Sequence, residues 1–505
     1  MSKYKLPENY IERKEMSYFD DSANFESDIV HQPEVYEAAE YFLQSGRRTT
    51  IIDVGCGSGR KLRSVNADRH IGVDFGSNLS FCRQRFDAWG EWIEADLSRE
   101  DCIVLADHAD GGTVVVCADV IEHLLDPEPL VALLCACYRR GALVLTSTPD
   151  RIRARGAEHC GPAPNRSHIR EWALEEYVEF LADHDLPVAY AGYTLNNSVM
   201  RELRTIVTIH DIAVDRARVN ATRDRPLAIL ACYNEADVIA EVAADIVEQG
   251  CDLVAIDNWS TDETWSILTT LAASNPLRIG LERFPAGGPD VHFEWRQILR
   301  RKEVVAHKFP GRWIVHTDAD ELRRSPFLDL TLADALHVAQ QTGANRVDFN
   351  VINFRPVDDR PFRPGTLETD LSYFEYGTRP GHFKQAKAWL QGADAVDLAS
   401  SGGHSAEFSG AVSFPYKFLL RHYPIRSAEH GRRKVLMERR GRWSPDERAA
   451  GWHVQYDEFS EMSSFKWEQE KLIGCDASFW REHGLPIMTD IAERRWKSRP
   501  RVDGP

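Results

Sequence analysis

The chain has 505 residues, of which 43% are hydrophobic and 28% charged, and its formal net charge is −17. This length exceeds a single compact core, so we expect more than one domain. An acidic chain repels phosphate backbones, which argues against a general nucleic-acid binder. No apolar run approaches the roughly 20 residues of a membrane helix, and the first residues lack a secretory signal. We therefore expect a cytoplasmic protein with no transmembrane segment, for which membrane contact would be peripheral.

The first part of the chain alternates short apolar runs with helical patterns, which is typical of a parallel α/β sheet. Strands are predicted at 49–55, 70–76, 113–120 and 141–148, a helix at 128–140, and a closing antiparallel pair at 187–195 and 203–211. A charged stretch without apolar periodicity follows and predicts a linker. The expected division is a first domain at 1–215 with residues 1–34 as a cap or lid, a linker at 216–225, and a second domain at 226–505 with a C-terminal helical extension.

A glycine-rich turn is the clearest local signal in the first half. The sequence IIDVGCGSG at 51–59 joins a predicted strand to a turn, and glycine there permits positive φ and close approach of a ligand. Asp74 ends the next predicted strand about 20 residues after Asp53, at the depth where an acid binds ribose hydroxyls. A turn that binds nothing is the alternative for the glycines alone. Their spacing departs from Gly-x-Gly-x-x-Gly, which disfavours a nicotinamide-dependent oxidoreductase.

Four segments in chain order, DVGCGSG, GVDFG, EADLS and ADVIEHLLDP, resemble the motif series of class I S-adenosylmethionine-dependent methyltransferases over residues 35–210. The resemblance implies a seven-stranded Rossmann-like sheet with S-adenosylmethionine as methyl donor. It implies that the glycines face the methionine part, Asp74 the ribose, and Asp119 the transferred methyl group. The implied cofactor-binding residues are Asp53, Gly55, Gly57, Gly59, Asp74, Asp96, Leu97 and Asp119.

The segment ADVIEHL places Asp119, Glu122 and His123 together at the end of a predicted strand. It resembles the carboxylate–x–x–Glu–His pattern of quinone-biosynthesis O-methyltransferases, which implies that these side chains hold a divalent cation able to acidify an acceptor hydroxyl. The alternative is that Glu122 and His123 cap the next helix. Downstream, HIREW resembles the His-x-x-Glu-Trp segment of small-molecule methyltransferases. His123 and His168 are therefore candidate catalytic residues, although a histidine at a helix entry is often structural.

The second half begins with its own α/β pattern, with strands predicted at 227–234 and 252–258 and a helix at 237–250. Asp318 and Asp320 follow the apolar strand WIVH. Two carboxylates one residue apart on an extended segment point to the same side, and their repulsion is costly unless a cation or protons neutralise it. A hard divalent ion that also binds a diphosphate would resolve this conflict.

The series Asn-Glu, DNWSTD, RQ and DADE, in this order, resembles family-2-like glycosyltransferases of GT-A fold over residues 226–425. The resemblance implies an inverting transfer of a sugar from a nucleotide-sugar donor with Mn²⁺ or Mg²⁺ held at Asp318 and Asp320. It also implies a nucleotide-sugar site made by Asn234, Glu235, Asp257, Arg296 and Asp318. A histidine is expected to complete the metal site. His404 and His422 are the candidates, and a resemblance of HYPIRS to this branch favours His422.

The base that inversion requires is not identified by spacing, because several acids lie in the irregular region after the metal motif. Glu375 is preferred because its aromatic neighbours could stack on a sugar, with core packing as the alternative for those rings. The basic stretch 421–443 is interpreted as a solvated surface, the alternative being contact with a pyrophosphate or an anionic lipid-linked acceptor.

The hypothesis from sequence is a bifunctional enzyme. It would transfer a methyl group to a sugar hydroxyl and a sugar to a glycan or lipid-linked glycan, in the synthesis of a surface polysaccharide or glycolipid. The alternative is one active transferase beside a degenerate domain that binds the acceptor.

Overall fold

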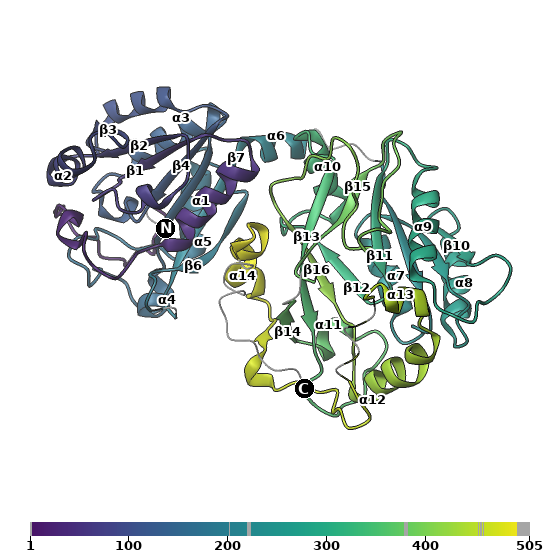
Figure 1. Ribbon diagram of the computed structural model, residues 1–505. Coiled ribbons are helices and arrows are strands. Elements are labelled where there is room, and N and C mark those ends of the chain that lie inside the picture. Colours follow the sequence, from purple (N-terminus) through teal and green to yellow (C-terminus); the bar gives the residue numbers. More distant parts are fainter. Residues whose placement is uncertain are drawn as a thin grey trace. The chain divides into compact units, whose positions relative to one another are not determined.

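The computed structural model describes residues 3–200, 202–219, 224–377, 382–452, 454, 457 and 459–491. The chain divides into two compact units. Unit 1 holds the described residues of Met1–Val219 together with Trp480–Ile491, and unit 2 holds those of Asn220–Phe479. Each unit is built on its own β-sheet with helices packed against it (Figure 1). The expected α/β architecture with two sheets is confirmed.

Unit 1 contains a seven-stranded sheet in the order β3-β2-β1-β4-β5-β7-β6. Neighbouring strands are parallel from β3 to β5, and β7 runs antiparallel to both β5 and β6. Every residue of β4 is buried, as expected for a parallel strand covered on both faces. The strands are β1 (Thr50–Val54), β2 (Arg69–Asp74), β3 (Glu91–Glu94), β4 (Thr113–Ala118), β5 (Leu143–Pro149), β6 (Tyr190–Leu195) and β7 (Arg204–Asp211).

The helices of unit 1 connect these strands and contribute apolar faces to one core, in which Phe180, Leu134 and Val115 are buried. The α-helices are α1 (Pro33–Ser45), α2 (Gly76–Phe86), α3 (Glu128–Arg139), α4 (Arg151–Arg155), α5 (Leu174–Asp183) and α6 (Ile212–Val219). Short 3-10 helices are η1 (Asp21–Asn24), η2 (Leu62–Ser64), η3 (Glu100–His108) and η4 (Ile121–His123).

Unit 2 contains a ten-stranded sheet whose main path is β10-β9-β8-β11-β15-β13-β14-β17; off this path, β16 pairs with β13, and β12 pairs with β16. The strands from β10 to β11 are parallel and β15 runs antiparallel to β11. The strands are β8 (Leu227–Cys232), β9 (Asp252–Asp257), β10 (Ile279–Arg283), β11 (Trp313–Asp318), β12 (Glu321–Arg324), β13 (Arg346–Phe354), β14 (Tyr373–Tyr376), β15 (Lys384–Leu390), β16 (Phe418–His422) and β17 (Ile473–Gly474).

The helices of unit 2 lie mainly in its first half and after β16. They are α7 (Ile239–Glu248), α8 (Thr264–Ser274), α9 (Trp295–Ala306), α10 (Leu332–Gln341), α11 (Leu367–Asp370), α12 (Ala428–Gly431) and α13 (Pro445–Ala449), with a π-helical segment η5 (Arg432–Arg439) and 3-10 helices η6 (Arg440–Arg442) and η8 (Gln469–Lys471). The region after β11, which has little periodicity in the sequence, is thus largely antiparallel sheet.

The last described helix, α14 (Phe479–Met488), differs from the expected C-terminal extension of the second domain. From Trp480 onward it belongs to unit 1, where Leu485 and Ile487 are fully buried. The hydroxyl of Tyr190 on β6 accepts a hydrogen bond from the Leu485 amide at 3.1 Å. An apolar helix face at the end of the chain therefore completes the core of the first domain.

The expected linker at 216–225 also differs in part, because α6 continues to Val219. Residues 220–223 lie outside the described part of the chain.

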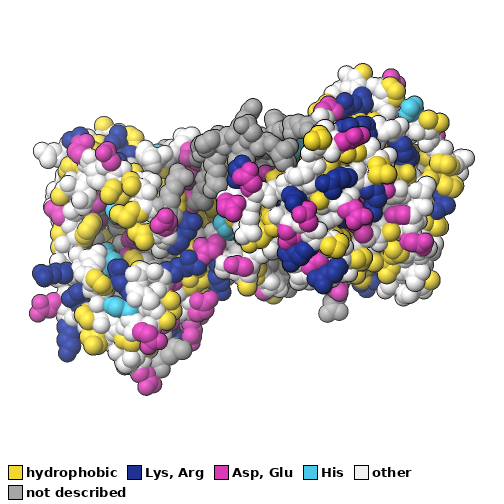
Figure 2. All heavy atoms as spheres, turned by 90° about the horizontal axis from the view of Figure 1, so that it is seen from below, with side chains coloured by type: hydrophobic (Ala, Val, Ile, Leu, Met, Phe, Trp, Pro, Cys, Tyr) yellow, Lys and Arg dark blue, Asp and Glu magenta, His cyan; other side chains and the backbone are white. Residues whose placement is uncertain are grey.

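No helix of the described residues is both long and apolar enough to cross a membrane. Figure 2 shows Lys and Arg side chains interspersed with Asp and Glu over one face of the protein, with no extended basic patch outside its grey atoms.

Candidate active sites

A cavity of about 580 Å³ opens in unit 1 at the carboxyl ends of its parallel strands. The glycine turn after β1 forms one wall, with Gly55 at φ 80° and Gly57 at φ 54°. A Cβ atom on Gly55 would collide with Val120, and one on Gly57 would lie 2.7 Å from Oδ2 of Asp21. Both the positive φ and the close approach therefore require glycine at these two positions.

Asp74, Leu97 and Asp119 also line this cavity. Asp74 at the end of β2 accepts a hydrogen bond from the Gly57 amide at 2.7 Å, which ties the acid to the glycine turn. Burial raises the pKa of Asp74 above its ordinary value. Asp119 has φ 54°, an uncommon conformation for a residue other than glycine, and accepts a hydrogen bond from Ser147 at 3.2 Å. The structure thus brings these three predicted residues to one pocket.

Three other residues assigned to the cofactor pocket from the sequence do not line it. Asp53 is fully buried below the turn, where it accepts hydrogen bonds from the hydroxyl of Tyr36, and burial raises its pKa to about 7. Gly59 packs against Trp92, and Asp96 accepts hydrogen bonds from Ser98 within its own loop. These three residues contact other protein groups and support the turns without lining the cavity. Motif spacing does not distinguish this supporting role from ligand contact.

The segment before α1 covers the glycine turn. Asp21 of η1 accepts hydrogen bonds from the amide and the hydroxyl of Ser58 at 3.0 and 2.7 Å. The Asn78 amide donates to the hydroxyl of Tyr18, and Tyr18 and Asp21 both line the cavity. Residues of the N-terminal segment thus form part of the pocket wall.

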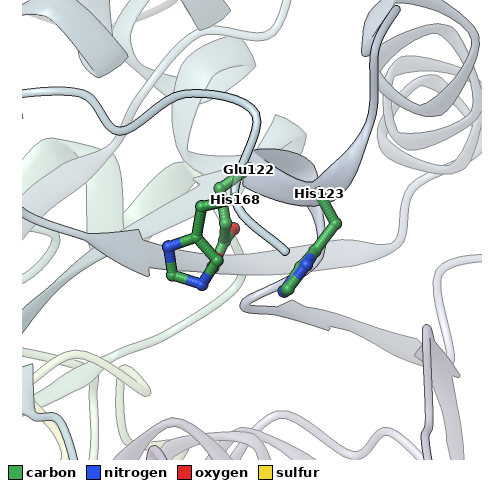
Figure 3. A group of neighbouring side chains, drawn as sticks. All are labelled: Glu122, His123 and His168. Carbon is green, nitrogen blue, oxygen red and sulfur yellow. The ribbon is translucent and has the colours of Figure 1, made fainter. Parts of the chain in front are cut away.

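Figure 3 shows a group of side chains that could hold a metal ion, of which His123 and His168 line the same cavity. Glu122 and His123 from η4 and His168 from the loop before α5 each offer one ligand atom, and these atoms lie within 4.8 Å of one another. Asp119, expected from the sequence as the third ligand, is not in this group. Instead, His168, more than 40 residues further along the chain, takes its place.

Both histidines of this group are oriented by hydrogen bonds through Nδ1. The Nδ1–H of His123 donates to the Ser167 carbonyl at 3.0 Å, and that of His168 donates to Glu171 at 2.7 Å. Burial lowers the pKa of His123 to about 4, so its ring is neutral at pH 7. Burial and the charge of Asp119 raise the pKa of Glu122. A helix-capping role does not account for this convergence of Glu122 and His123 with His168.

A second cavity, of about 400 Å³, lies in unit 2 at the carboxyl ends of β8 and β11. Its wall contains five predicted residues: Glu235, Asp318, Asp320, His404 and His422. Sequence reasoning missed several others, because their positions carry no local motif. These are Trp295, Asn353, Lys387, Arg439, Arg442 and Trp452.

The carboxylates after β11 are neutralised by buried amines. The Nζ atoms of Lys302 and Lys387 each lie 3.5 Å from an oxygen of Asp318, and Lys387 also contacts Glu321 at 2.7 Å. Burial alone would raise the pKa of Asp318, but Lys387 and Lys302 lower it below its ordinary value. Burial lowers the pKa of Lys302 to about 8 despite the nearby acid.

The basic stretch 421–443 is only in part the solvated surface expected from the sequence, because Arg432 and Arg433 are exposed whereas Arg426 and Lys434 are buried. Arg426 and Lys434 are 2% and 3% exposed. Lys434 donates to Oδ2 of Asp320 at 2.8 Å and lies 2.9 Å from Glu235, and Arg426 contacts Glu235 at 2.6 Å. Burial would raise the pKa of Glu235, but Lys434 and Arg426 hold it well below its usual range. Buried charges persist only when paired, which explains these contacts.

His422 and His404 occupy different environments. The Nδ1–H of His422 donates to Oδ1 of Asn353 at 2.8 Å, and Nε2 of His422 lies 3.8 Å from Oδ1 of Asp320. Burial lowers the pKa of His422, so a lone pair on Nε2 faces a carboxylate oxygen. His404 packs against the ring of His382 instead, and burial lowers its pKa to about 4.

Four predicted residues lie outside the lining of this cavity. Asn234 bonds to Thr261 through both ends of its amide, and Asp257 lies 3.2 Å from Arg283. Arg296 stacks on Trp452, which itself lines the cavity. Glu375, the preferred base, pairs with Arg355 at 2.7 Å on β14. Its aromatic neighbours Phe374 and Tyr376 are buried in the core rather than open to a sugar.

Comparison with known families finds one matching domain model in each half of the chain. Residues 32–189 match the methyltransferase domain model, and residues 228–289 match the model of glycosyl transferase family 2. The chain joins a methyltransferase domain to a family 2 glycosyltransferase domain. Both are transferase families, so the two cavities belong to transferase domains. The matched methyltransferase domain contains the glycine turn, and the matched glycosyltransferase domain begins within β8.

Solved structures similar to the chain are methyltransferases. An S-adenosylmethionine-dependent methyltransferase from Aquifex aeolicus is 14% identical with a TM-score of 0.28, over 38% of this chain and 100% of that chain. The magnesium protoporphyrin IX methyltransferase of Synechocystis PCC 6803 with bound S-adenosylhomocysteine is 16% identical with a TM-score of 0.25, over 35% and 81%. No curated protein matches the chain.

Proposed function

We propose that the chain is a bifunctional enzyme that methylates a sugar hydroxyl with S-adenosylmethionine and transfers a sugar, with inversion, from a nucleotide-sugar donor. One observation carries this proposal: each domain gathers several of its motif residues at a cavity at the carboxyl ends of its parallel strands. Ligands of open α/β sheets bind at this edge. The acceptor would be a glycan or lipid-linked glycan made into a surface polysaccharide or glycolipid in the cytoplasm.

In the methyltransferase domain, the described residues fit S-adenosylmethionine. The wall formed by Gly55 and Gly57 admits close approach of the methionine part, and Asp74 is placed to accept hydrogen bonds from ribose hydroxyls. Asp119 would lie near the sulfonium, whose positive charge its carboxylate would stabilise. Methyl transfer needs the donor methyl and the acceptor oxygen in line, so the acceptor would enter from the side of β5 and β7.

The group of Glu122, His123 and His168 fits a divalent cation. Oε1 of Glu122 is buried with no hydrogen-bond partner among the described residues, and Nε2 of His123 is free of a proton. Binding of a cation to Nε2 of His168 would replace the hydrogen bond that Asn165 donates to this atom. A bound cation would lower the pKa of an acceptor hydroxyl. Mn²⁺ or Mg²⁺ at this position supports O-methylation rather than methylation of a neutral amine.

Removal of divalent cations with EDTA should lower methyl transfer at least about tenfold, because the acceptor hydroxyl loses its activation. Mn²⁺ or Mg²⁺ should restore the wild type but not His123→Ala, while the affinity for S-adenosylhomocysteine stays unchanged in both. His108→Ala, a histidine that does not line the cavity, is the matched control. Methyl transfer that is indifferent to EDTA in the wild type would reject the cation and leave His123 and His168 as candidate bases.

In the glycosyltransferase domain, Asp320 and His422 fit a divalent cation that carries the donor diphosphate. The lone pair of His422 Nε2 opposite Oδ1 of Asp320 is unfavourable unless a cation lies between them. Asn353 orients the imidazole, as is usual for a metal-bound histidine. When bound, the cation would neutralise charge on the leaving diphosphate. His404 lies on the same wall but lacks a carboxylate within ion-pair distance among the described residues.

The remaining groups of this site would position the donor and accept the acceptor proton. Arg439 and Arg442 line the cavity and suit the donor phosphates. Because Glu375 is engaged with Arg355 outside the cavity, we place the base among the lining acids instead. These are Glu235, Asp318, Asp320, Glu321 and Glu438.

The test is to incubate the purified chain with S-adenosylmethionine, Mn²⁺, a panel of nucleotide sugars and sugar acceptors. The mass of each product is then measured by mass spectrometry. We expect products that carry a hexose-type increment, a methyl increment, or both. If the chain binds neither S-adenosylhomocysteine nor any nucleoside diphosphate, the proposal fails. If only one increment ever appears, the other domain is a binding module.

A further inference from the structure

The cavity of the methyltransferase domain extends well beyond its cofactor motifs. Three of the four motifs lie at the ends of β1, β2 and β3, on one side of β4 in the sheet order, and the fourth follows β4 itself. On the other side, Arg153 from α4 after β5 and Arg204 at the start of β7 line the same cavity. If the donor lies against the glycine turn, in-line methyl transfer leaves this wall free to contact the acceptor.

Arg204 is unusually poor in partners for a partly buried arginine. Its guanidinium makes no hydrogen bond within the described residues, and its nearest acid is Glu482, with Nε and Oε2 3.7 Å apart. Burial lowers the pKa of Arg204, the charge of Glu482 opposes this shift, and repulsion by Arg153 adds to it. A guanidinium has five donors in a planar fork, so Arg204 retains its capacity for a bidentate anion.

Arg153 is held in place beside Arg204. Its guanidinium stacks 3.9 Å from the ring centroid of Tyr193 and donates to Oε1 of Glu482. One carboxylate thus faces two guanidinium groups and leaves a net positive charge at this wall. Arg155 lines the same end but lies 3.6 Å from Glu171, and Glu202 is exposed to solvent.

Glu482 itself reaches this wall from the end of the chain. It belongs to α14, which follows the whole glycosyltransferase domain in sequence and packs into unit 1. Its carboxylate occupies the position that an anionic ligand of Arg153 and Arg204 would share. The C-terminal helix therefore supplies a competing charge to the methyl-acceptor side of the first domain.

We propose that Arg153 and Arg204 form an anion subsite for the methyl acceptor, which carries a carboxylate or phosphate group, and that Glu482 weakens this subsite. The inference rests on the proposed methyl transfer and names the class of its acceptor. Arginine suits this role because it pairs bidentately with carboxylate and phosphate oxygens.

The experiment uses the full chain saturated with S-adenosylhomocysteine and titrates glucuronate, glucose 6-phosphate and glucose by calorimetry. We expect the wild type to bind at least one of the two anions and to bind glucose more weakly. Arg204→Gln should weaken anion binding about tenfold, the value of one lost charge-assisted contact. Glu482→Gln should strengthen it, because the competing charge is removed while the side chain keeps its shape. Arg139→Gln, an exposed arginine paired with Asp185, is the control.

The opposite signs of the two variants separate ligand binding from a structural role. If Arg204 and Glu482 only anchor α14, both variants should lower the melting temperature and neither should change anion affinity selectively, which overturns the proposal. Equal affinities for glucose and both anions in the wild type also overturn it. Whether the carboxylate or the phosphate binds identifies the acceptor class. Failure to bind S-adenosylhomocysteine would instead reject the proposed methyl transfer.

Discussion

Asp320→Asn should reduce sugar transfer about a thousandfold while methyl transfer by the same chain continues. The substitution removes the negative charge that we propose holds the cation on the donor diphosphate, and such a cation stabilises the transition state by several kcal/mol. The asparagine keeps a side-chain oxygen that can still accept the hydrogen bond from Lys434. The ion-pair network around Glu235 therefore remains in place, and the loss should reflect catalysis rather than unfolding.

Initial rates of transfer from the preferred nucleotide sugar, measured across a range of Mn²⁺ concentrations, provide the readout. Asp290→Asn is the matched control, because Asp290 is exposed and lies outside the cavity lining. His422→Ala should resemble Asp320→Asn if the two side chains share one cation. Wild-type rates in Asp320→Asn at low Mn²⁺ would contradict the assignment of Asp320 and move attention to the buried lysines.

Gly57→Val should abolish methyl transfer and weaken S-adenosylhomocysteine binding at least about a hundredfold. Valine strongly disfavours the positive φ that Gly57 adopts, and its Cβ would meet Oδ2 of Asp21 at 2.7 Å. The turn would have to move, and with it the hydrogen bond from the Gly57 amide to Asp74. Strain and lost contacts of on the order of 3 kcal/mol correspond to this change in affinity.

Calorimetric titration with S-adenosylhomocysteine measures the effect directly. Gly111→Ala is the control within the same unit, because a Cβ there meets nothing within 4 Å. Sugar transfer by the second domain should be retained in Gly57→Val, which shows that the effect is confined to the first domain. Unchanged S-adenosylhomocysteine affinity would mean that the cofactor does not lie against this turn.

The local chemistry of both sites was predictable from sequence because it depends on short strand–turn–helix segments. The turn at Gly55 and Gly57 and Asp320 follow strands, and Asp74 and Asp318 are the last residues of theirs. Parallel strands meet at one edge, so their motif residues converge whatever the loops do. Motif spacing did not predict the orientation of Asp53, Asp96 and Asp257. A side chain next to a cavity-lining residue in the sequence can instead face the core or its own loop.

Charge pairing could not be predicted, because it depends on contacts between distant parts of the chain. Lys434 and Asp320 are 114 positions apart, and Arg426 and Glu235 are 191 apart. From sequence alone, the segment of Arg426 and Lys434 has the composition of a solvated surface. Burial makes each charge depend on a partner, and only the folded chain reveals which partner that is.

By itself, therefore, the sequence determined that the chain has two α/β domains and which strand ends contribute residues to the two cavities, because hydrophobic periodicity and turn residues act locally. The tertiary structure decided that His168 joins Glu122 and His123, and that α14 returns to the first domain after the second is complete. Tyr190 and Leu485 are 295 positions apart, and the side chains that bring them together are ordinary apolar residues with no distinguishing motif. Apolar packing selects its partner by shape and available surface, which exist only once the sheet has formed.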